Sequence, residues 1–367
     1  MRTERRYDID WLRTVGVLLV IPFHTLIMFN MNPWSIVYIK DTVNVPFFNI
    51  MDSIIDRFHM PLLFILAGMS VYYALKSRSP SQFAKERMRK LLVPAVFGCV
   101  VLNPIMTYIY MVSKNVNISF ANHLINFFTK NPGDLTGIDG GFTPAHLWFI
   151  IFLFVFSLAG LPIFILLNKK ISEKFILGLA TLLEKPLMLT FVIIPITILS
   201  LTDILGDKNP LVYFFMFIIG YFLVSDERYQ KALNRDKWIY LLLSIILIYI
   251  KFNISSHNAP WSIQWIAYGL MDKATRIVPV FAIIGLANCF IDKNTAVLGY
   301  LSQASFAIYV IHMLINTVVG SFILRLKINV GIKYALIVLV TFILCFFVYE
   351  IIRRIKVLSF IFAIKKS

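Results

Sequence analysis

The sequence predicts an all-α, polytopic integral membrane protein, and three properties of the chain support this class. Hydrophobic residues make up 59% of the 367 positions and charged residues only 15%. The 33 Phe and 16 Tyr are typical of lipid-facing helices with aromatic belts at the interfaces. The longest polar loop, Ser113 to Ala145, is too short to form a domain of its own. We therefore expect a single transmembrane domain over residues 1–367.

Apolar stretches of membrane-spanning length recur along the chain, although proline residues shorten or interrupt several of them. We expect about ten transmembrane helices, at roughly 11 to 31, 52 to 75, 89 to 113, 145 to 167, 186 to 203, 210 to 224, 237 to 252, 262 to 290, 301 to 325 and 333 to 353.

The basic residues predict the orientation of these spans. With both termini in the cytoplasm, the tails and most basic loops fall on the cytoplasmic side, as the positive-inside rule requires. The opposite loops hold only scattered lysines. This asymmetry accounts for the net charge of +16 and leaves no need for a nucleic-acid partner. The cytoplasmic clusters include Arg2, Arg5, Arg6, Arg78, Lys85, Lys169, Lys170, Arg228, Lys231, Arg353 and Arg354.

The first apolar stretch carries three ionisable side chains, which is costly inside a membrane and suggests a function. Arg13 and His24 are eleven residues apart, so a helix returns them to within about 20° of one another, with about 16 Å of rise between them. Asp10 lies one turn before Arg13 on nearly the same face. The simpler interpretation is that Arg13 anchors the helix at the cytoplasmic surface and that His24 is satisfied by a backbone carbonyl.

Further polar side chains intrude into the second, fourth and ninth spans. Each has a structural explanation, such as an interfacial belt or hydrogen bonds between helices. Four histidines at similar depth in otherwise apolar helices together indicate a polar cavity in which protons are transferred. We expect neither a metal nor a prosthetic group. The predicted residues besides His24 are His59, His146, Trp148, Ser305, Tyr309 and His312.

A basic pair precedes the third span. Arg87 and Lys90 are one helical turn apart, and Arg13 would stand at the same membrane surface. Such a set of cations is suited to phosphate groups. A stop-transfer cluster that only fixes topology is the alternative interpretation.

Several short motifs occur along the chain, namely Arg13-x10-His24, Arg87-x-x-Lys90, Met60 to Gly68, His146-Leu-Trp-Phe, Phe214 to Gly220, Ser305 to His312 and Tyr349-Glu350-Ile-Ile-Arg-Arg-Ile. In their order and spacing, these motifs resemble the membrane acyltransferase family 3 over nearly the whole chain. The resemblance is closest to the branch of the glucan biosynthesis protein C, which transfers succinyl groups to glucan. The second basic position of that family is usually Arg, whereas this chain has Lys90, which keeps the charge and loses the bidentate fork.

The resemblance implies a multi-pass enzyme of the bacterial inner or plasma membrane. It would transfer an acyl group of the acetyl or succinyl class from cytoplasmic acyl-CoA to a hydroxyl of an envelope carbohydrate. His24 is the candidate general base or acyl relay, with Arg13 and Asp10 beside it in the catalytic set, while Arg13, Arg87 and Lys90 would bind the donor. We expect the remaining predicted residues to bind the acceptor. A proton-coupled transporter is the competing function, although we find no internal repeat.

Overall fold

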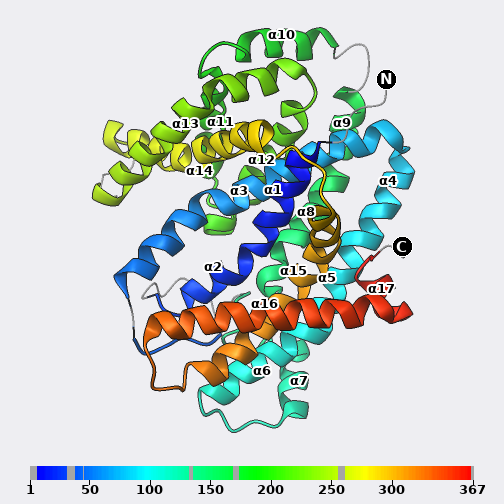
Figure 1. The fold of residues 1–367 in the computed structure, drawn as a ribbon, viewed down its shortest axis with the longest axis vertical. Coiled ribbons are helices and arrows are strands. Elements are labelled where there is room, and N and C mark those ends of the chain that lie inside the picture. Colours follow the sequence, from blue (N-terminus) through cyan, green and yellow to red (C-terminus); the bar gives the residue numbers. More distant parts are fainter. Residues whose placement is uncertain are drawn as a thin grey trace. The chain divides into compact units, whose positions relative to one another are not determined.

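The structure is a computed structural model that describes residues 6–30, 38–43, 45–131, 135–167, 173–254 and 261–364. Within these ranges the regular elements are helices, and no strand occurs (Figure 1). The α-helices are α1 (Tyr7–Leu18), α2 (Val20–Ile27), α3 (Pro46–Ser77), α4 (Pro80–Arg87), α5 (Val93–Phe97), α6 (Asn103–Ser113), α7 (Phe120–Thr129), α8 (Trp148–Ala159), α9 (Leu161–Leu167), α10 (Glu173–Leu183), α11 (Ile193–Ser200), α12 (Pro210–Leu223), α13 (Glu227–Asn253), α14 (Ile263–Phe290), α15 (Ala296–Ile323), α16 (Val330–Arg354) and α17 (Lys356–Ile361).

Five segments of the described chain are long and apolar enough to cross a membrane, and the number rises to eight if each of three sharply bent helix pairs is one span. The five are Tyr7–Ile27, Pro46–Ser77, Pro80–Ser113, Ala296–Ile323 and Val330–Arg354. The bent pairs are Ala145–Ala159 with Leu161–Leu167, Lys174–Leu183 with Met188–Ser200, and Gly206–Leu223 with Glu227–Asn253. The all-helical membrane class is confirmed at this level, while the count of about ten and the cytoplasmic termini stay predictions.

The chain forms two compact units, each assembled from three separate segments. The first unit contains residues 1–16, 56–84 and 155–298, and the second contains residues 17–55, 85–154 and 299–367. The expectation of one domain over the whole chain stays a prediction. Each unit is described by itself below.

In the first unit, α13 and α14 lie side by side over much of their length (Figure 1). Side-chain caps begin both helices: the Asp226 carboxylate accepts from Arg228 N–H, and the Ser262 hydroxyl accepts from Trp265 N–H. Gly285 allows the close approach, because a Cβ there would lie 2.5 Å from the Leu233 carbonyl oxygen.

A second close crossing joins α3 and α12 within the same unit. A Cβ at Gly68 would lie 1.8 Å from the Phe217 carbonyl oxygen, and one at Gly220 would lie 1.9 Å from the Ile65 carbonyl oxygen. Each helix thus presents a glycine to the backbone of the other. Small residues at a crossing are how membrane helices gain close backbone packing without a hydrophobic driving force.

The second unit has an apolar core between α2, α6, α15 and α16. Its buried members include Leu26, Phe29, Met106, Met313 and Ile337. Near this core the loop before α3 is held to α16 by an ion pair, in which Lys333 Nζ lies 2.8 Å from Asp41 Oδ2 and both side chains are buried.

Two elements differ from the helices that the sequence predicts. The expected third span begins earlier, at α4, and two π-helical turns, Met88–Leu92 and Gly98–Leu102, interrupt it. The expected seventh span is also longer, because α13 begins at Glu227 and includes the basic residues assigned to a loop. The sequence prediction missed this extension because the first turns of α13 are rich in charged residues, and hydropathy detects only its apolar part.

Candidate functional site

Three of the predicted histidines lie together in the second unit. His24 belongs to α2, His146 to the 3₁₀ turn Ala145–Leu147, and His312 to α15. The His312 ring stacks on His24 at a centroid distance of 5.4 Å and meets His146 edge-on at 4.8 Å. We call these three rings the histidine row. The structure brings His312 into contact with both His24 and His146, while the polar cavity that the sequence predicted around them stays a prediction.

Local structure positions each ring. Tyr309 and His312 fall on one face of α15, since a helix returns to the same face every three or four residues. Ala145 has a positive φ of 46°, which is strained for a residue with a side chain. The Thr143 hydroxyl stabilises this turn by accepting the Ala145 N–H at 2.9 Å. The strained turn therefore directs His146 toward α15.

Reciprocal hydrogen bonds lock His146 to α15. His146 Nε2 donates to the Val310 carbonyl at 3.1 Å, and the Tyr309 hydroxyl donates to the His146 carbonyl. His312 Nδ1 donates to the Tyr309 carbonyl at 2.7 Å. Because a carbonyl oxygen only accepts, each of these nitrogens must carry the proton. The opposite nitrogens, His146 Nδ1 and His312 Nε2, are buried and have no hydrogen-bond partner among the described residues. In the neutral form of each ring, the unpartnered nitrogen is thus the one that can accept a proton.

Burial differs along the row. His312 is fully buried and His146 is 8% exposed, whereas His24 is only partly buried. His24 is therefore the member with the best access to a ligand, and His312 connects it to the interior.

Asn316 extends the polar face of α15, and the sequence prediction missed it. Its Oδ1 accepts from the Thr25 hydroxyl at 3.2 Å and from the Thr341 hydroxyl at 3.3 Å. Its amide nitrogen is therefore the donor end, and it has no acceptor among the described residues. The sequence contains a signal for this residue, because Asn316 follows His312 by one helical turn and so falls on the same face.

The other predicted acceptor residues are placed differently. Ser305 donates to the Ser302 carbonyl at 3.2 Å, and Trp148 packs edge-on against Phe152. His59 belongs to the first unit, where its Nε2 donates to the Gly16 carbonyl at 2.7 Å. Of the six expected acceptor residues, the structure brings Tyr309, His146 and His312 into direct contact.

The predicted donor residues are each engaged locally. In the first unit, Arg13 forms an ion pair with Asp10 at 2.8 Å, and the guanidinium side chain stays 42% exposed. In the second unit, Lys90 pairs with Glu86, one turn earlier. The π turn over Met88–Leu92 begins directly after Arg87 and contains Lys90, so the spacing of these two side chains is not that of a regular α-helix.

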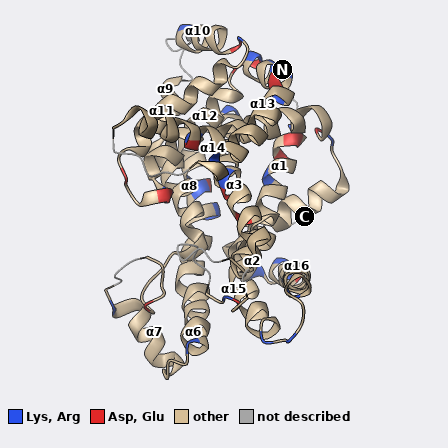
Figure 2. Cartoon of the chain, turned by 90° about the vertical axis from the view of Figure 1, so that its left-hand side faces the viewer, with Lys and Arg blue, Asp and Glu red and all other residues tan. Residues whose placement is uncertain are grey.

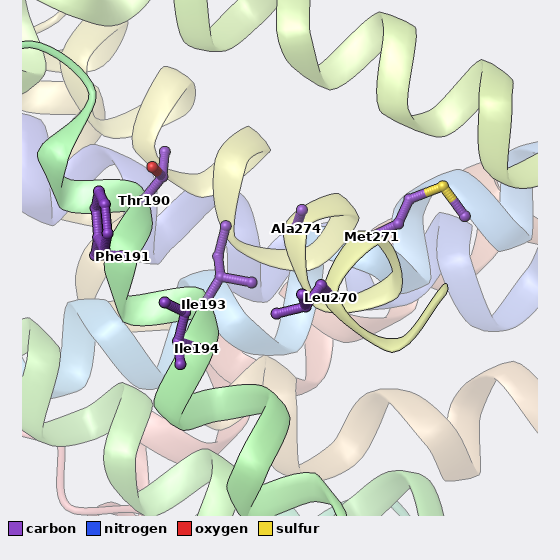
Figure 3. A pocket seen from close by; sticks show the side chains of 7 residues that line it. All are labelled: Thr190, Phe191, Ile193, Ile194, Leu270, Met271 and Ala274. Carbon is purple, nitrogen blue, oxygen red and sulfur yellow. The ribbon is translucent and has the colours of Figure 1, made fainter. Parts of the chain in front are cut away.

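An apolar cavity of about 330 Å³ lies in the first unit between α14 and the start of α11 (Figure 3). Its lining contains no titratable side chain and one hydroxyl, so it offers no acid–base chemistry. The lining residues are Thr190, Phe191, Ile193, Ile194, Leu270, Met271 and Ala274. Among the described residues, no group of three His, Cys, Asp or Glu side chains could hold a metal ion.

Comparison with known families gives one match that covers nearly the whole chain. A family model described as an acyltransferase domain matches residues 6–350. The chain belongs to this acyltransferase family. Comparison with curated proteins and with solved structures gives no match.

Membership in the acyltransferase family identifies the chain as a membrane acyltransferase and confirms the resemblance at the level of the family. The assignment to the branch of the glucan biosynthesis protein C stays a prediction. The matched range includes every predicted site residue, from Asp10 to His312. Within it, the histidine row is the arrangement whose geometry suits proton transfer.

Proposed function

We propose that this acyltransferase transfers an acyl group of the acetyl or succinyl class from cytoplasmic acyl-CoA to a hydroxyl of an envelope carbohydrate, in the bacterial cell membrane. The observation that carries the proposal is the histidine row, in which the partly exposed His24 ring stacks on His312, and His312 in turn meets His146 edge-on. The carbohydrate acceptor and the succinyl-transfer branch come from the resemblance.

A sugar hydroxyl is a weak nucleophile near neutral pH. In the proposed reaction His24 takes the hydroxyl proton while the oxygen attacks the thioester carbonyl. The carbon–sulfur bond then breaks, and the departing thiolate recovers a proton from the imidazolium. General-base assistance of this kind contributes roughly a hundredfold to ten-thousandfold in rate.

Two neighbours support His24 in this role. His312 Nε2 lies in the adjacent ring and has no hydrogen-bond partner among the described residues, so it is suited to share the transferred proton. The Asn316 amide nitrogen supplies a hydrogen-bond donor for the oxyanion that forms on the carbonyl oxygen.

The resemblance assigns donor binding to Arg13, Arg87 and Lys90. Lys90 already pairs with Glu86, so it binds a phosphate only by giving up or sharing that contact. Arg13 keeps an exposed guanidinium beside Asp10, which leaves several of its N–H groups free to face an anion.

The deciding experiment measures acyl transfer by the purified full-length protein in nanodiscs. Labelled acetyl-CoA and succinyl-CoA are the donors, and soluble glucan oligosaccharides are the acceptors. We expect His24→Gln to reduce turnover at least a hundredfold and to leave donor binding nearly unchanged. His123→Gln is the matched control, because His123 contacts Thr107 and Pro104 on α6 and makes no contact with the row.

Wild-type protein that binds neither donor would contradict the proposal. Proton-coupled uptake of a solute into liposomes, without acyl transfer, would favour the transporter instead. Mass spectrometry after mixing enzyme and donor without acceptor separates the two roles of His24: an acyl group on the peptide that contains His24 indicates a relay, and its absence indicates a general base.

A further inference from the structure

A cluster of cations surrounds one carboxylate in the first unit. Asp272 on α14 accepts from Arg57 on α3 at 2.5 Å and from its neighbour Lys273 at 3.0 Å, and Lys251 on α13 lies 3.1 Å away. Arg276 follows one turn later on α14. We call these five residues the Asp272 cluster; Figure 2 shows charged residues gathered along α3 and α14.

Arg276 is the member without a hydrogen bond. Its side chain is 12% exposed, yet its nearest carboxylate oxygens lie at 3.8 Å in Asp56 and Asp272 and at 3.9 Å in Asp207. These distances exceed hydrogen-bonding range. The Arg276 Nε is buried and has no partner among the described residues. A nearly buried guanidinium without a hydrogen bond is rare, because hydrogen bonds normally compensate much of its desolvation.

The neighbouring carboxylates do not neutralise the cluster. Asp56 is 52% exposed and Asp207 is 98% exposed, so water screens both strongly. Asp272 is the one largely buried carboxylate, and it is shared by four cations. The cluster therefore carries an excess of positive charge in a region of low dielectric, where a bound anion would be held firmly.

We propose that the Asp272 cluster binds a phosphate group, with Arg276 as its principal ligand. The guanidinium fork matches two phosphate oxygens at once, and the ammonium groups of Lys251 and Lys273 keep donors beyond those that face Asp272. A phosphate has enough oxygens to accept from several of these groups together. A carboxylate has only two oxygens, and the excess charge suits a phosphate better.

The site lies far along α14 from the other polar network of the first unit. Near the far end of α14, Asn288 donates to Asp8 at 3.2 Å, and Asp8 also pairs with Arg6 near the N-terminus. Asn288 is 16 residues from Asp272, which is about 24 Å of helix rise. The phosphate site is therefore separate from that network, and it does not depend on the proposed function. Its ligand is a lipid headgroup or a soluble phosphorylated molecule.

The test uses full-length protein, delipidated in a maltoside detergent, and follows its thermal unfolding midpoint. One arm titrates inorganic phosphate and glycerol 3-phosphate at constant ionic strength. The other arm titrates a short-chain phosphatidylglycerol against the matching diacylglycerol, which lacks the phosphate. We expect saturable stabilisation in at least one arm. Stabilisation in the first arm identifies a soluble phosphate ligand. Stabilisation in the second arm alone identifies a lipid headgroup.

Two variants test whether the stabilisation arises from binding at the Asp272 cluster. Arg276→Gln should weaken binding at least tenfold, whereas Lys231→Gln, which removes the same charge from a 75% exposed position, should bind as wild type does. If Arg276→Gln does not yield folded protein, Arg276→Lys takes its place, and loss of the fork should weaken binding at least threefold. Absence of saturable stabilisation in both arms, or equal binding by the Arg276 and Lys231 variants, would overturn the proposal.

Discussion

The glycine crossing between α3 and α12 makes Gly220→Ala strongly informative. An alanine Cβ at this position would lie 1.9 Å from the Ile65 carbonyl oxygen and 3.0 Å from the Ile65 Cα. A carbon and a carbonyl oxygen need about 3.3 Å, so the two backbones must separate by more than about 1 Å. No rotamer change relieves this contact, because the oxygen belongs to the main chain and the main chain fixes the position of the Cβ.

The size of the effect combines two opposing contributions. Overpacking of this kind costs up to about 3 kcal/mol, and the higher helix propensity of alanine returns about 1 kcal/mol. We therefore expect Gly220→Ala to lower the free energy of unfolding by about 2 kcal/mol. The measurement is reversible unfolding in mixed micelles by titration with a denaturing detergent.

Gly178→Ala is the matched control. Gly178 also lies within a helix, α10, but a Cβ there would have no neighbour within 4 Å. Only the propensity contribution remains, so this variant should be more stable than wild type by up to about 1 kcal/mol. If both glycine variants shift stability in the same direction and by the same amount, the crossing is not as close as described.

Three further outcomes follow from the second unit. His312→Asn should lower turnover at least tenfold with little change in donor affinity, which steady-state kinetics checks; a changed KM alone would contradict its role in proton transfer. Asn316→Leu should reduce kcat by about a hundredfold if its amide binds the oxyanion, and equal kcat for variant and wild type would exclude that role. Burial tends to raise the pKa of Asp41, but the hydrogen bond from Lys333 and those from backbone N–H groups hold it below 3.8. The resulting stabilisation is complete above the unfolded-state pKa of about 4 and is lost as the pH falls through the folded-state value. Unfolding measured against pH should show this loss, and Asp41→Asn should remove the dependence while destabilising the protein by about 3 kcal/mol near neutral pH, because Lys333 is left buried and unpaired.

Hydropathy and helical periodicity predicted the fold class and much of the second-unit site. Tyr309 and His312 share a face because their spacing on α15 is regular, and regular spacing can be read from a sequence. His146 was predicted to have similar depth, but its contact with α15 depends on the strained turn at Ala145, which no periodicity encodes.

The features that the sequence did not predict depend on contacts between distant segments. The Asp272 cluster joins three helices, and Arg57 is 215 residues from Asp272. The glycines at positions 68 and 220 matched a family motif, yet their mutual crossing became visible only in three dimensions. Likewise, the π turns of the third span escape prediction, because an apolar run has the same hydropathy whether its turns are regular or widened.

The two π turns before α6 also bear on how this chain tolerates changes in length. Each bonds residue i to residue i+5, so it holds one residue more than the regular turn it replaces. Deleting one residue within Gly98–Leu102 would therefore let a regular turn form, while Asn103 would still face Thr143, to whose carbonyl it donates at 2.8 Å. A deletion within α6 would instead rotate everything after it by about 100°. Chains with this architecture can thus differ by one residue in these turns and keep the same faces toward their neighbours.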